Sequence, residues 1–240
     1  MKTAIKTVDL TKKFGDKTAV NHMNLEIYEG EIFGLLGVNG AGKTTTIRML
    51  TGLSAVTDGD AYVFDLDIKK DLQKIKSLIN VSTQETAVAE NLTVKENLKF
   101  IADIYGISDE AAKTSMQNII SSLELGEVQN QKAKTLSGGW QRRLSIAMAL
   151  ITNPKIIFLD EPTLGLDVLA RRELWKVVQS LKGKVTVILT THYLEEVEAL
   201  CDRIAVMTNG KIKALGTADE LKKSVGKDSL EDAFVEIVEN

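Results

Sequence analysis

The 240-residue sequence contains one cysteine, two histidines and two prolines, and aromatic residues make up only 5% of it. The single cysteine, Cys201, cannot form an internal disulfide, which is typical of proteins from a reducing compartment. Two histidines and one cysteine are also too few for a convincing zinc site. A chain of this length can bury a sizeable core without either kind of cross-link.

The chain also lacks a strong charge of one sign and a long hydrophobic run. Its net charge of −3 gives no basic field that would attract nucleic acid, so we expect no nucleic-acid partner. No window approaches the roughly 18 consecutive apolar residues that a membrane span requires. The first residues have no apolar core and no small-residue cleavage site, so no signal peptide is predicted. We therefore expect a cytoplasmic protein that reaches a membrane only through a partner.

The apolar pattern changes along the chain in a way that indicates the fold class. Apolar and polar residues alternate before residue 30, which predicts half-buried antiparallel strands. Three later runs are short and almost wholly apolar, as in strands buried on both faces. These runs span residues 32–36, 156–159 and 185–189. Helical patterns separate them, over residues 45–50, 137–151 and 169–181. The alternation predicts an α/β domain with a largely parallel sheet and an N-terminal antiparallel part.

The middle of the chain, residues 85–134, has apolar positions at helical spacing and no buried-strand run. We predict an inserted α-helical subdomain there, to which the helix at 137–151 also belongs. Residues 1–84 and 135–225 then form the core of a single domain that spans 1–240. We predict a C-terminal helix within 226–240, because Ser229 to Asp232 resembles a capping box.

Residues 37–44 carry the sharpest chemical signal, because they match the pattern G-x-x-x-x-G-K-[ST] between a buried strand and a helix. Glycines let backbone N–H groups converge on a phosphate, and a helix N-terminus adds partial positive charge. In such a loop Lys43 reaches the β- and γ-phosphates and Thr44 is a ligand of Mg²⁺. A glycine-rich turn with an exposed lysine is the alternative, which the flanking strand and helix argue against. The predicted nucleotide contacts are Gly37, Asn39, Gly40, Ala41, Gly42, Lys43, Thr44 and Thr45.

Two adjacent acids, Asp160 and Glu161, end the apolar run at 156–159. Desolvating charge at the end of a buried strand is costly, so a pair of acids there indicates function rather than a simple acidic turn. We expect Asp160 to hold Mg²⁺, through water, and Glu161 to polarise the attacking water as general base. Together with residues 37–44, the pair indicates a P-loop nucleotidase and leaves GTPases, kinases and helicases open.

Residues 136–141, Leu-Ser-Gly-Gly-Trp-Gln, strongly resemble the signature motif of ABC ATPases. The resemblance runs from about residue 3 to residue 238, and further motifs appear in the order of that family. The matching positions are Phe14 (adenine-stacking aromatic), Gln84 (Q-loop), residues 165–167 with Asp167 (D-loop) and His192 (switch histidine).

The resemblance implies ATP and Mg²⁺ as ligands and a dimer of two nucleotide domains. Ser137, Gly138 and Gly139 of one subunit would close over ATP held by the other, and Asp167 would lie at the contact. Gln84 would join the magnesium shell, and His192 would contact the γ-phosphate. The second domain could be another copy or a homologue.

Two positions depart from the usual family pattern. Trp140 replaces the usual glutamine of the signature motif, and we expect this to alter packing rather than abolish activity. Phe14 stands where the family more often has tyrosine, and simple packing is the alternative to its stacking role. We also expect Arg142 and Arg143 to lie on a solvated helix face and not to form a nucleic-acid patch.

Within the family, residues 229–234, Ser-Leu-Glu-Asp-Ala-Phe, resemble a C-terminal signature of bacterial ABC-2 type exporters. This resemblance implies a subunit that drives export through an integral membrane permease, bound to the inner face of the cell membrane. The main alternative is a soluble ABC-type ATPase without a membrane partner. Repair ATPases of that kind carry a long coiled coil, and no sustained heptads occur here. Translation factors carry two nucleotide domains joined by a charged linker. The signature motif and the pair Asp160 and Glu161 argue against a kinase, and the absence of an Asn-Lys-x-Asp base-reading motif argues against a GTPase.

Overall fold

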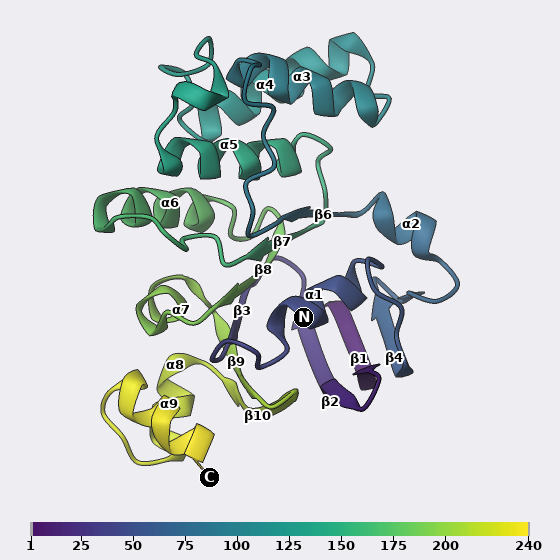
Figure 1. Ribbon diagram of the computed structural model, residues 1–240, viewed down its shortest axis with the longest axis vertical. Helices are drawn as coiled ribbons and strands as arrows, with labels where there is room; N and C mark the ends of the chain where they lie inside the picture. Colours follow the sequence, from purple (N-terminus) through teal and green to yellow (C-terminus); the bar gives the residue numbers. More distant parts are fainter. Residues whose placement is uncertain (1, 240) are drawn as a thin grey trace.

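The computed structural model describes residues 2–239, which fold into two sheets flanked by helices (Figure 1). The smaller sheet is antiparallel, with the strand order β2-β1-β4-β5. Its first two strands form a long hairpin, as the alternating N-terminal pattern predicts. The strands are β1 (Thr3–Phe14), β2 (Lys17–Tyr28), β4 (Asp58–Val63) and β5 (Leu66–Asp67).

The larger sheet has the order β10-β9-β3-β8-β7-β6, and only the β9–β10 pair is antiparallel. All five residues of β3 and of β7 are buried, which confirms the prediction of strands covered on both faces. Neighbouring parallel strands end at one edge, so the loops after β3, β7 and β8 meet there. The strands are β3 (Ile32–Leu36), β6 (Ile79–Ser82), β7 (Ile156–Asp160), β8 (Thr186–Thr191), β9 (Arg203–Thr208) and β10 (Lys211–Gly216).

Two apolar clusters fill the two faces of the larger sheet. Phe33 and Leu35 of β3 point into the cluster shared with the small sheet and α1, whereas Ile32 and Leu36 join the cluster under the other helices. The period of two along β3 thus divides its side chains between the faces.

The helices are α1 (Lys43–Leu50), α2 (Leu72–Lys76), α3 (Val94–Ile104), α4 (Asp109–Ser122), α5 (Gly138–Leu150), α6 (Val168–Ser180), α7 (Leu194–Leu200), α8 (Ala218–Ser224), α9 (Leu230–Glu239) and the 3₁₀ turn Ala133–Thr135.

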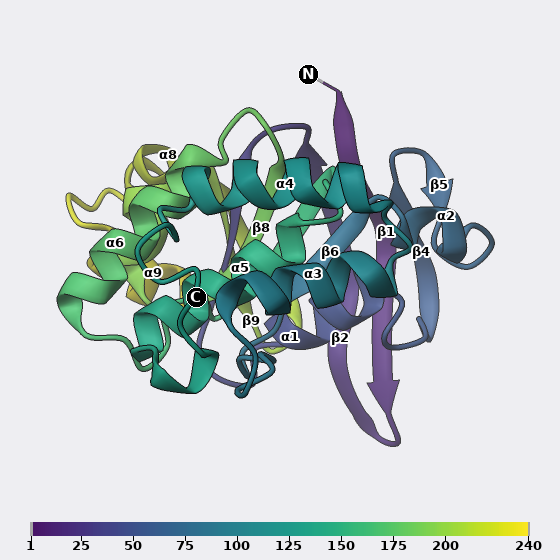
Figure 2. The same ribbon diagram turned by 90° about the horizontal axis from the view of Figure 1, so that it is seen from above.

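The segment predicted as a helical insert contains α3 and α4, which pack on each other and on α5 (Figure 2). Helix α3 begins at a capping box, in which Thr93 accepts from the Glu96 amide and the Glu96 carboxylate accepts from the Thr93 amide. An isolated bridge between Thr93 and Lys132 joins the two ends of the segment. Among residues 2–239, no helix combines the length and apolar character needed to cross a bilayer.

The prediction of a solvated face for Arg142 and Arg143 is wrong. Both side chains are buried, because α5 lies between the insert and the larger sheet and residues 142–149 are all covered.

At the C-terminus, α9 begins at Leu230 within the segment predicted to be helical, but only half of the expected capping box forms. The Asp232 amide donates to Ser229 Oγ, whereas the Asp232 carboxylate accepts from that same hydroxyl.

Candidate nucleotide site

The loop between β3 and α1 can follow its path only with glycine at particular positions. Gly42 has φ of 109°, and a Cβ there would lie 2.4 Å from the carbonyl oxygen of Ala19. A Cβ on Gly37 would lie 2.2 Å from the carbonyl oxygen of Met207. Helix α1 begins directly after this loop, at Lys43. The loop therefore presents backbone N–H groups and a helix N-terminus on the same side, which is an arrangement suited to phosphate.

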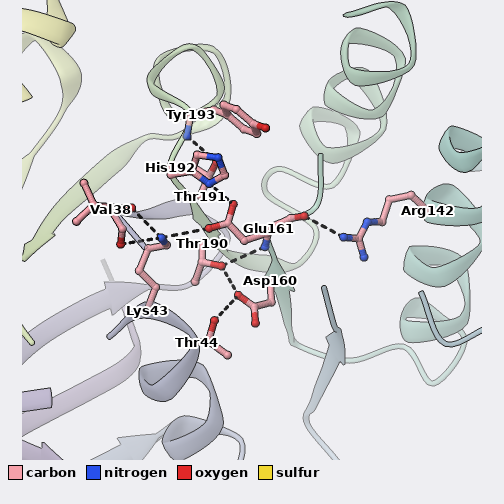
Figure 3. A network of polar contacts seen from close by, with 11 residues as sticks. Val38, Lys43, Thr44, Arg142, Asp160, Glu161, Thr190, Thr191, His192 and Tyr193 are labelled. Carbon is pink, nitrogen blue, oxygen red and sulfur yellow. Dashed lines mark hydrogen bonds and ion pairs between the residues drawn. The ribbon is translucent and has the colours of Figure 1, made fainter. Parts of the chain in front are cut away.

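Lys43 points back over this loop and is almost completely buried. Its Nζ donates to the carbonyl of Gly37 at 2.7 Å and lies 3.2 Å from Oε1 of Glu161 (Figure 3). A buried cation needs a partner of opposite charge, and Glu161 supplies it here. The pair places one positive and one negative group at the floor of the site.

Thr44 and Asp160 meet beside this pair, with Thr44 Oγ1 donating to Asp160 Oδ1 at 3.2 Å. The Thr190 hydroxyl donates to the same carboxylate oxygen. Residues 2–239 contain no group of three or more His, Cys, Asp or Glu side chains placed so that they could hold a metal ion. One hydroxyl and one carboxylate nevertheless fit Mg²⁺, which takes one or two protein carboxylates and completes its shell with phosphates and water.

Glu161 occupies a strained backbone position directly after β7. Its φ is 49°, in the left-handed region that non-glycine residues seldom adopt. Its amide donates to both the hydroxyl and the carbonyl of Thr190, each at 3.1 Å. The carboxylate is thereby turned toward Lys43 on one side and His192 on the other, and His192 Nδ1 lies 2.9 Å from Oε2.

A cleft of about 560 Å³ opens above these residues and brings together most of the predicted site. Phe14 at the end of β1 is 55% exposed and forms one wall, and the exposed Gln84 lies after β6. Of the predicted residues, Phe14, Asn39, Gly40, Ala41, Gly42, Lys43, Thr44, Thr45, Gln84, Glu161 and His192 line the cleft.

Six predicted residues do not line this cleft. Two of them, Gly37 and Asp160, instead accept hydrogen bonds from Lys43 and Thr44 of its lining. Ser137 and Gly138 are exposed at the start of α5, and Ser137 and Gly139 line a separate groove beside α4 and α6. Asp167 caps α6, where its carboxylate accepts from the Ala170 amide at 2.9 Å. A single chain therefore presents two helix N-termini that we predict to bind phosphate, and they do not share a cleft.

The comparison with known families decides the identity of this arrangement. A family model described as ABC transporter matches residues 20–164. The chain belongs to this family. The "Probable multidrug ABC transporter ATP-binding protein YbhF" of Escherichia coli is 40% identical over an alignment of 242 positions, which covers 98% of this chain and 42% of YbhF. The daunorubicin/doxorubicin resistance ATP-binding protein DrrA of Streptomyces peucetius is 41% identical over 228 residues, 95% of this chain and 69% of DrrA.

Solved ABC structures share the whole fold. The ATP-binding cassette MJ1267 in its ADP conformation superimposes with a TM-score of 0.86 at 29% identity, over 99% of this chain and 98% of that one. The ABC family and its P-loop fold are thus confirmed, and the chain is an ATPase that binds nucleotide. The chain spans less than half the length of YbhF, and 13% of human phospholipid-transporting ATPase ABCA3, to which it is 40% identical.

Sequence reasoning missed several residues around the ABC site. Lys17, Ala19 and Leu164 also line the cleft. Lys17 and Ala19 lie on β2, across the hairpin from Phe14. The turn expected after Phe14 was the sequence signal that could have placed them beside it.

Glu196 of α7 is fully buried, and its carboxylate accepts from the indole N–H of Trp175 at 3.3 Å. Burial raises the pKa of the Glu196 carboxyl, and the nearby Glu161 raises it further. Nothing in the local sequence of Glu196 indicates this burial.

Proposed function

We propose that this chain hydrolyses ATP between two paired nucleotide domains and thereby drives export through an integral membrane permease. The observation that carries the pairing is the separation of the two anion sites. The cleft holds Lys43 and Glu161, whereas Ser137 and Gly138 lie exposed outside it. A second domain that presents its own signature residues over the cleft completes the site.

A hydrophobic surface beside Asp167 supports a second nucleotide domain as the partner. Leu164, Val168 and Leu169 are 37%, 62% and 76% exposed. These apolar side chains lie three, seven and eight residues after Glu161, and Leu164 itself lines the cleft. A partner that covered them would therefore also reach the cleft. Burial of such a patch favours association by the hydrophobic effect. The partner's signature residues would also bind the negatively charged phosphates of ATP in the cleft. We therefore expect the association to depend on ATP.

The helical insert offers a second hydrophobic surface, which we assign to the permease. Val94, Leu98 and Ala102 of α3 are buried, whereas Phe100 and Ile104 are 50% and 61% exposed. Tyr105, at the end of the helix, is also exposed. A large aromatic and aliphatic patch on an otherwise polar surface is typical of a protein contact. Contact with a permease would hold the chain at the inner face of the cell membrane.

The residues of the cleft have separate roles in hydrolysis. Thr44 and Asp160, with Gln84 nearby, would hold Mg²⁺, which when bound withdraws charge from the phosphates. Lys43 and the backbone of residues 37–45 bind the phosphates, and Phe14 stacks on the base. Glu161 orients and polarises the attacking water as general base. His192 holds the Glu161 carboxylate through Nδ1, and its ring lies in the cleft where the γ-phosphate would bind.

Export is supported by the names of two relatives, which mention multidrug transport and resistance to daunorubicin and doxorubicin. The residues of this chain that contact ATP carry no information on the transported molecule. Recognition of that molecule is therefore assigned to the permease.

A copurification experiment tests the membrane partner. The tagged chain is isolated from native cells after gentle membrane extraction, beside Phe100→Glu/Ile104→Glu and the control Val235→Glu, which alters an exposed residue of α9. We expect a stoichiometric polytopic protein with the wild type and the control but not with the double variant. A soluble partner, or none, would favour the soluble ABC-type ATPase.

A second experiment tests the pairing. Glu161→Gln should bind ATP with only a small residual turnover and so accumulate as an ATP-bound dimer, measured by light scattering after size exclusion. Leu169→Glu added to this variant should prevent the dimer, and Val235→Glu should not. A Glu161→Gln chain that stays monomeric with saturating ATP, Mg²⁺ and any homologous partner chain would contradict the proposal.

A further inference from the structure

Arg142 of α5 is buried against the site, and no carboxylate of residues 2–239 lies within hydrogen-bond distance of it. Its side chain is 3% exposed, and its guanidinium donates to four backbone carbonyls. Burial lowers the pKa of Arg142, and the nearby charges of Asp160 and Glu196 oppose this effect. An arginine remains protonated under such conditions, and bonds from a charged donor are stronger than neutral ones.

The four carbonyls belong to two loops that each carry a residue of the nucleotide site. Nε donates to Pro162 at 2.8 Å, and Nη2 donates to Glu161 at 2.9 Å. Nη2 also donates to Gln84 at 3.0 Å, and Nη1 donates to the neighbouring Thr83. One side chain thus joins the loop after β6, the loop after β7 and the helix that begins after Ser137. Figure 3 shows Arg142 reaching from α5 to the Glu161 carbonyl.

The bond to Glu161 bears on the strained conformation of that residue. A left-handed φ persists in a non-glycine residue only where the surroundings enforce it. On the N-terminal side the Glu161 amide is held by Thr190, and on the C-terminal side the carbonyl is held by Arg142. These contacts fix both peptide planes around the Cα atom and so fix the direction of the carboxylate.

We propose that Arg142 is a positioning residue that holds Glu161 in its hydrolytic orientation and couples that orientation to the Gln84 loop and to the signature end of α5. The inference rests on the assignment of Glu161 as the general base. A displacement of the Gln84 loop would pull on Arg142 and shift the carboxylate. A misplacement of about 1 Å can cost on the order of 100-fold in rate.

The test compares Arg142→Lys with Arg143→Lys in steady-state ATP hydrolysis by the full chain. Arg143 is an equally buried neighbour that contacts Leu123, Glu124 and Trp140 instead of the two loops. Lysine lacks the fork of donors that reaches four carbonyls. We expect Arg142→Lys to lower kcat by roughly 10- to 100-fold with an ATP KM within about twofold of wild type. Arg143→Lys should change neither constant by more than about twofold.

A Glu161→Gln background separates positioning from general damage. Once the base is absent its orientation no longer matters, so Arg142→Lys should leave the residual rate unchanged there. An equal slowing in both backgrounds, or a wild-type kcat for Arg142→Lys, would overturn the proposal. Arg142→Gln, which keeps two donors, replaces Arg142→Lys if that chain does not fold. Wild-type hydrolysis by Glu161→Gln alone would instead refute Glu161 as the base.

Discussion

The Nδ1 atom of His192 lies 2.9 Å from Oε2 of Glu161, while Lys43 Nζ lies 3.2 Å from the other oxygen of the same carboxylate. An ionised carboxylate only accepts hydrogen bonds, so Nδ1 carries the proton when Glu161 is ionised. The imidazole and the ammonium group thus restrain the carboxylate from two sides. This relationship makes the roles of the three residues separable by substitution.

We expect His192→Ala to reduce hydrolysis mainly by releasing the Glu161 carboxylate. Glu161→Gln should lower kcat by roughly 100-fold or more, as for other general bases, and His192→Ala should lower it by less. Because the two residues act through one water, the double variant should be no slower than Glu161→Gln. Single-turnover hydrolysis measures this directly, and fully additive losses would show that His192 acts independently of Glu161.

Lys43→Met should weaken ATP binding by at least about tenfold, because charged hydrogen bonds to phosphate are lost. The same change leaves the Glu161 carboxylate buried without its cation and should lower the free energy of unfolding by about 3 kcal/mol. Adding Glu161→Gln removes the unpaired charge, so it should restore stability but not affinity. Binding of a fluorescent ATP analogue and urea unfolding distinguish the two effects. Unchanged affinity in Lys43→Met would contradict the phosphate-binding role.

Much of the cleft was predictable because its motifs are local. A glycine loop between a buried strand and a helix fixes the backbone around Lys43 whatever the rest of the chain does. Asp160 and Glu161 end an apolar strand, so their place at a sheet edge was also predictable. The strand order β3-β8-β7 was not, because it depends on pairings between distant segments. That order is what brings Thr190 against Asp160.

Arg142 and Glu196 show where sequence reasoning failed. Both are charged residues on helices, where a solvated position is the usual expectation. One signal was available for Arg142, because the residues after it, 144–149, are apolar or small around the whole helix, which indicates burial on every side. Its partners are carbonyls of the loops after β6 and β7, and only the folded chain brings these within reach.

Phe14 provides a prediction that separates base stacking from phosphate binding. Stacking of a nucleobase on an aromatic ring contributes about 1–3 kcal/mol, so Phe14→Ala should weaken ATP binding by at least about fivefold. Phe14→Tyr keeps the ring and should bind ATP as the wild type does. Inorganic tripolyphosphate has no base, so its affinity should be the same in all three chains. A parallel loss for tripolyphosphate, measured by competition, would assign Phe14 to the shape of the loop instead.

The buried carboxyl of Glu196 makes stability depend on pH in a known direction. Burial raises its folded pKa above the ordinary value of 4.5, outweighing the hydrogen bonds that favour its ionised form. The folded chain therefore prefers the protonated acid, and this stabilisation is complete below the unfolded pKa and lost as pH rises through the folded one. The loss of stability amounts to about 1.4 kcal/mol for every tenfold difference between the acid dissociation constants of Glu196 in the folded and the unfolded chain.

Glu196→Gln imitates the protonated acid and cannot ionise, so the wild type should lose stability relative to this variant as pH rises above 4.5 and reach a constant difference above the folded pKa. Urea unfolding at a series of pH values measures the difference. The control is Glu198→Gln on the same helix, because Glu198 is exposed and its ion pair with Lys222 spans 3.6 Å at the surface. Its curve should stay parallel to that of the wild type. Parallel curves for Glu196→Gln as well would mean that Glu196 is as acidic in the folded chain as in the unfolded one.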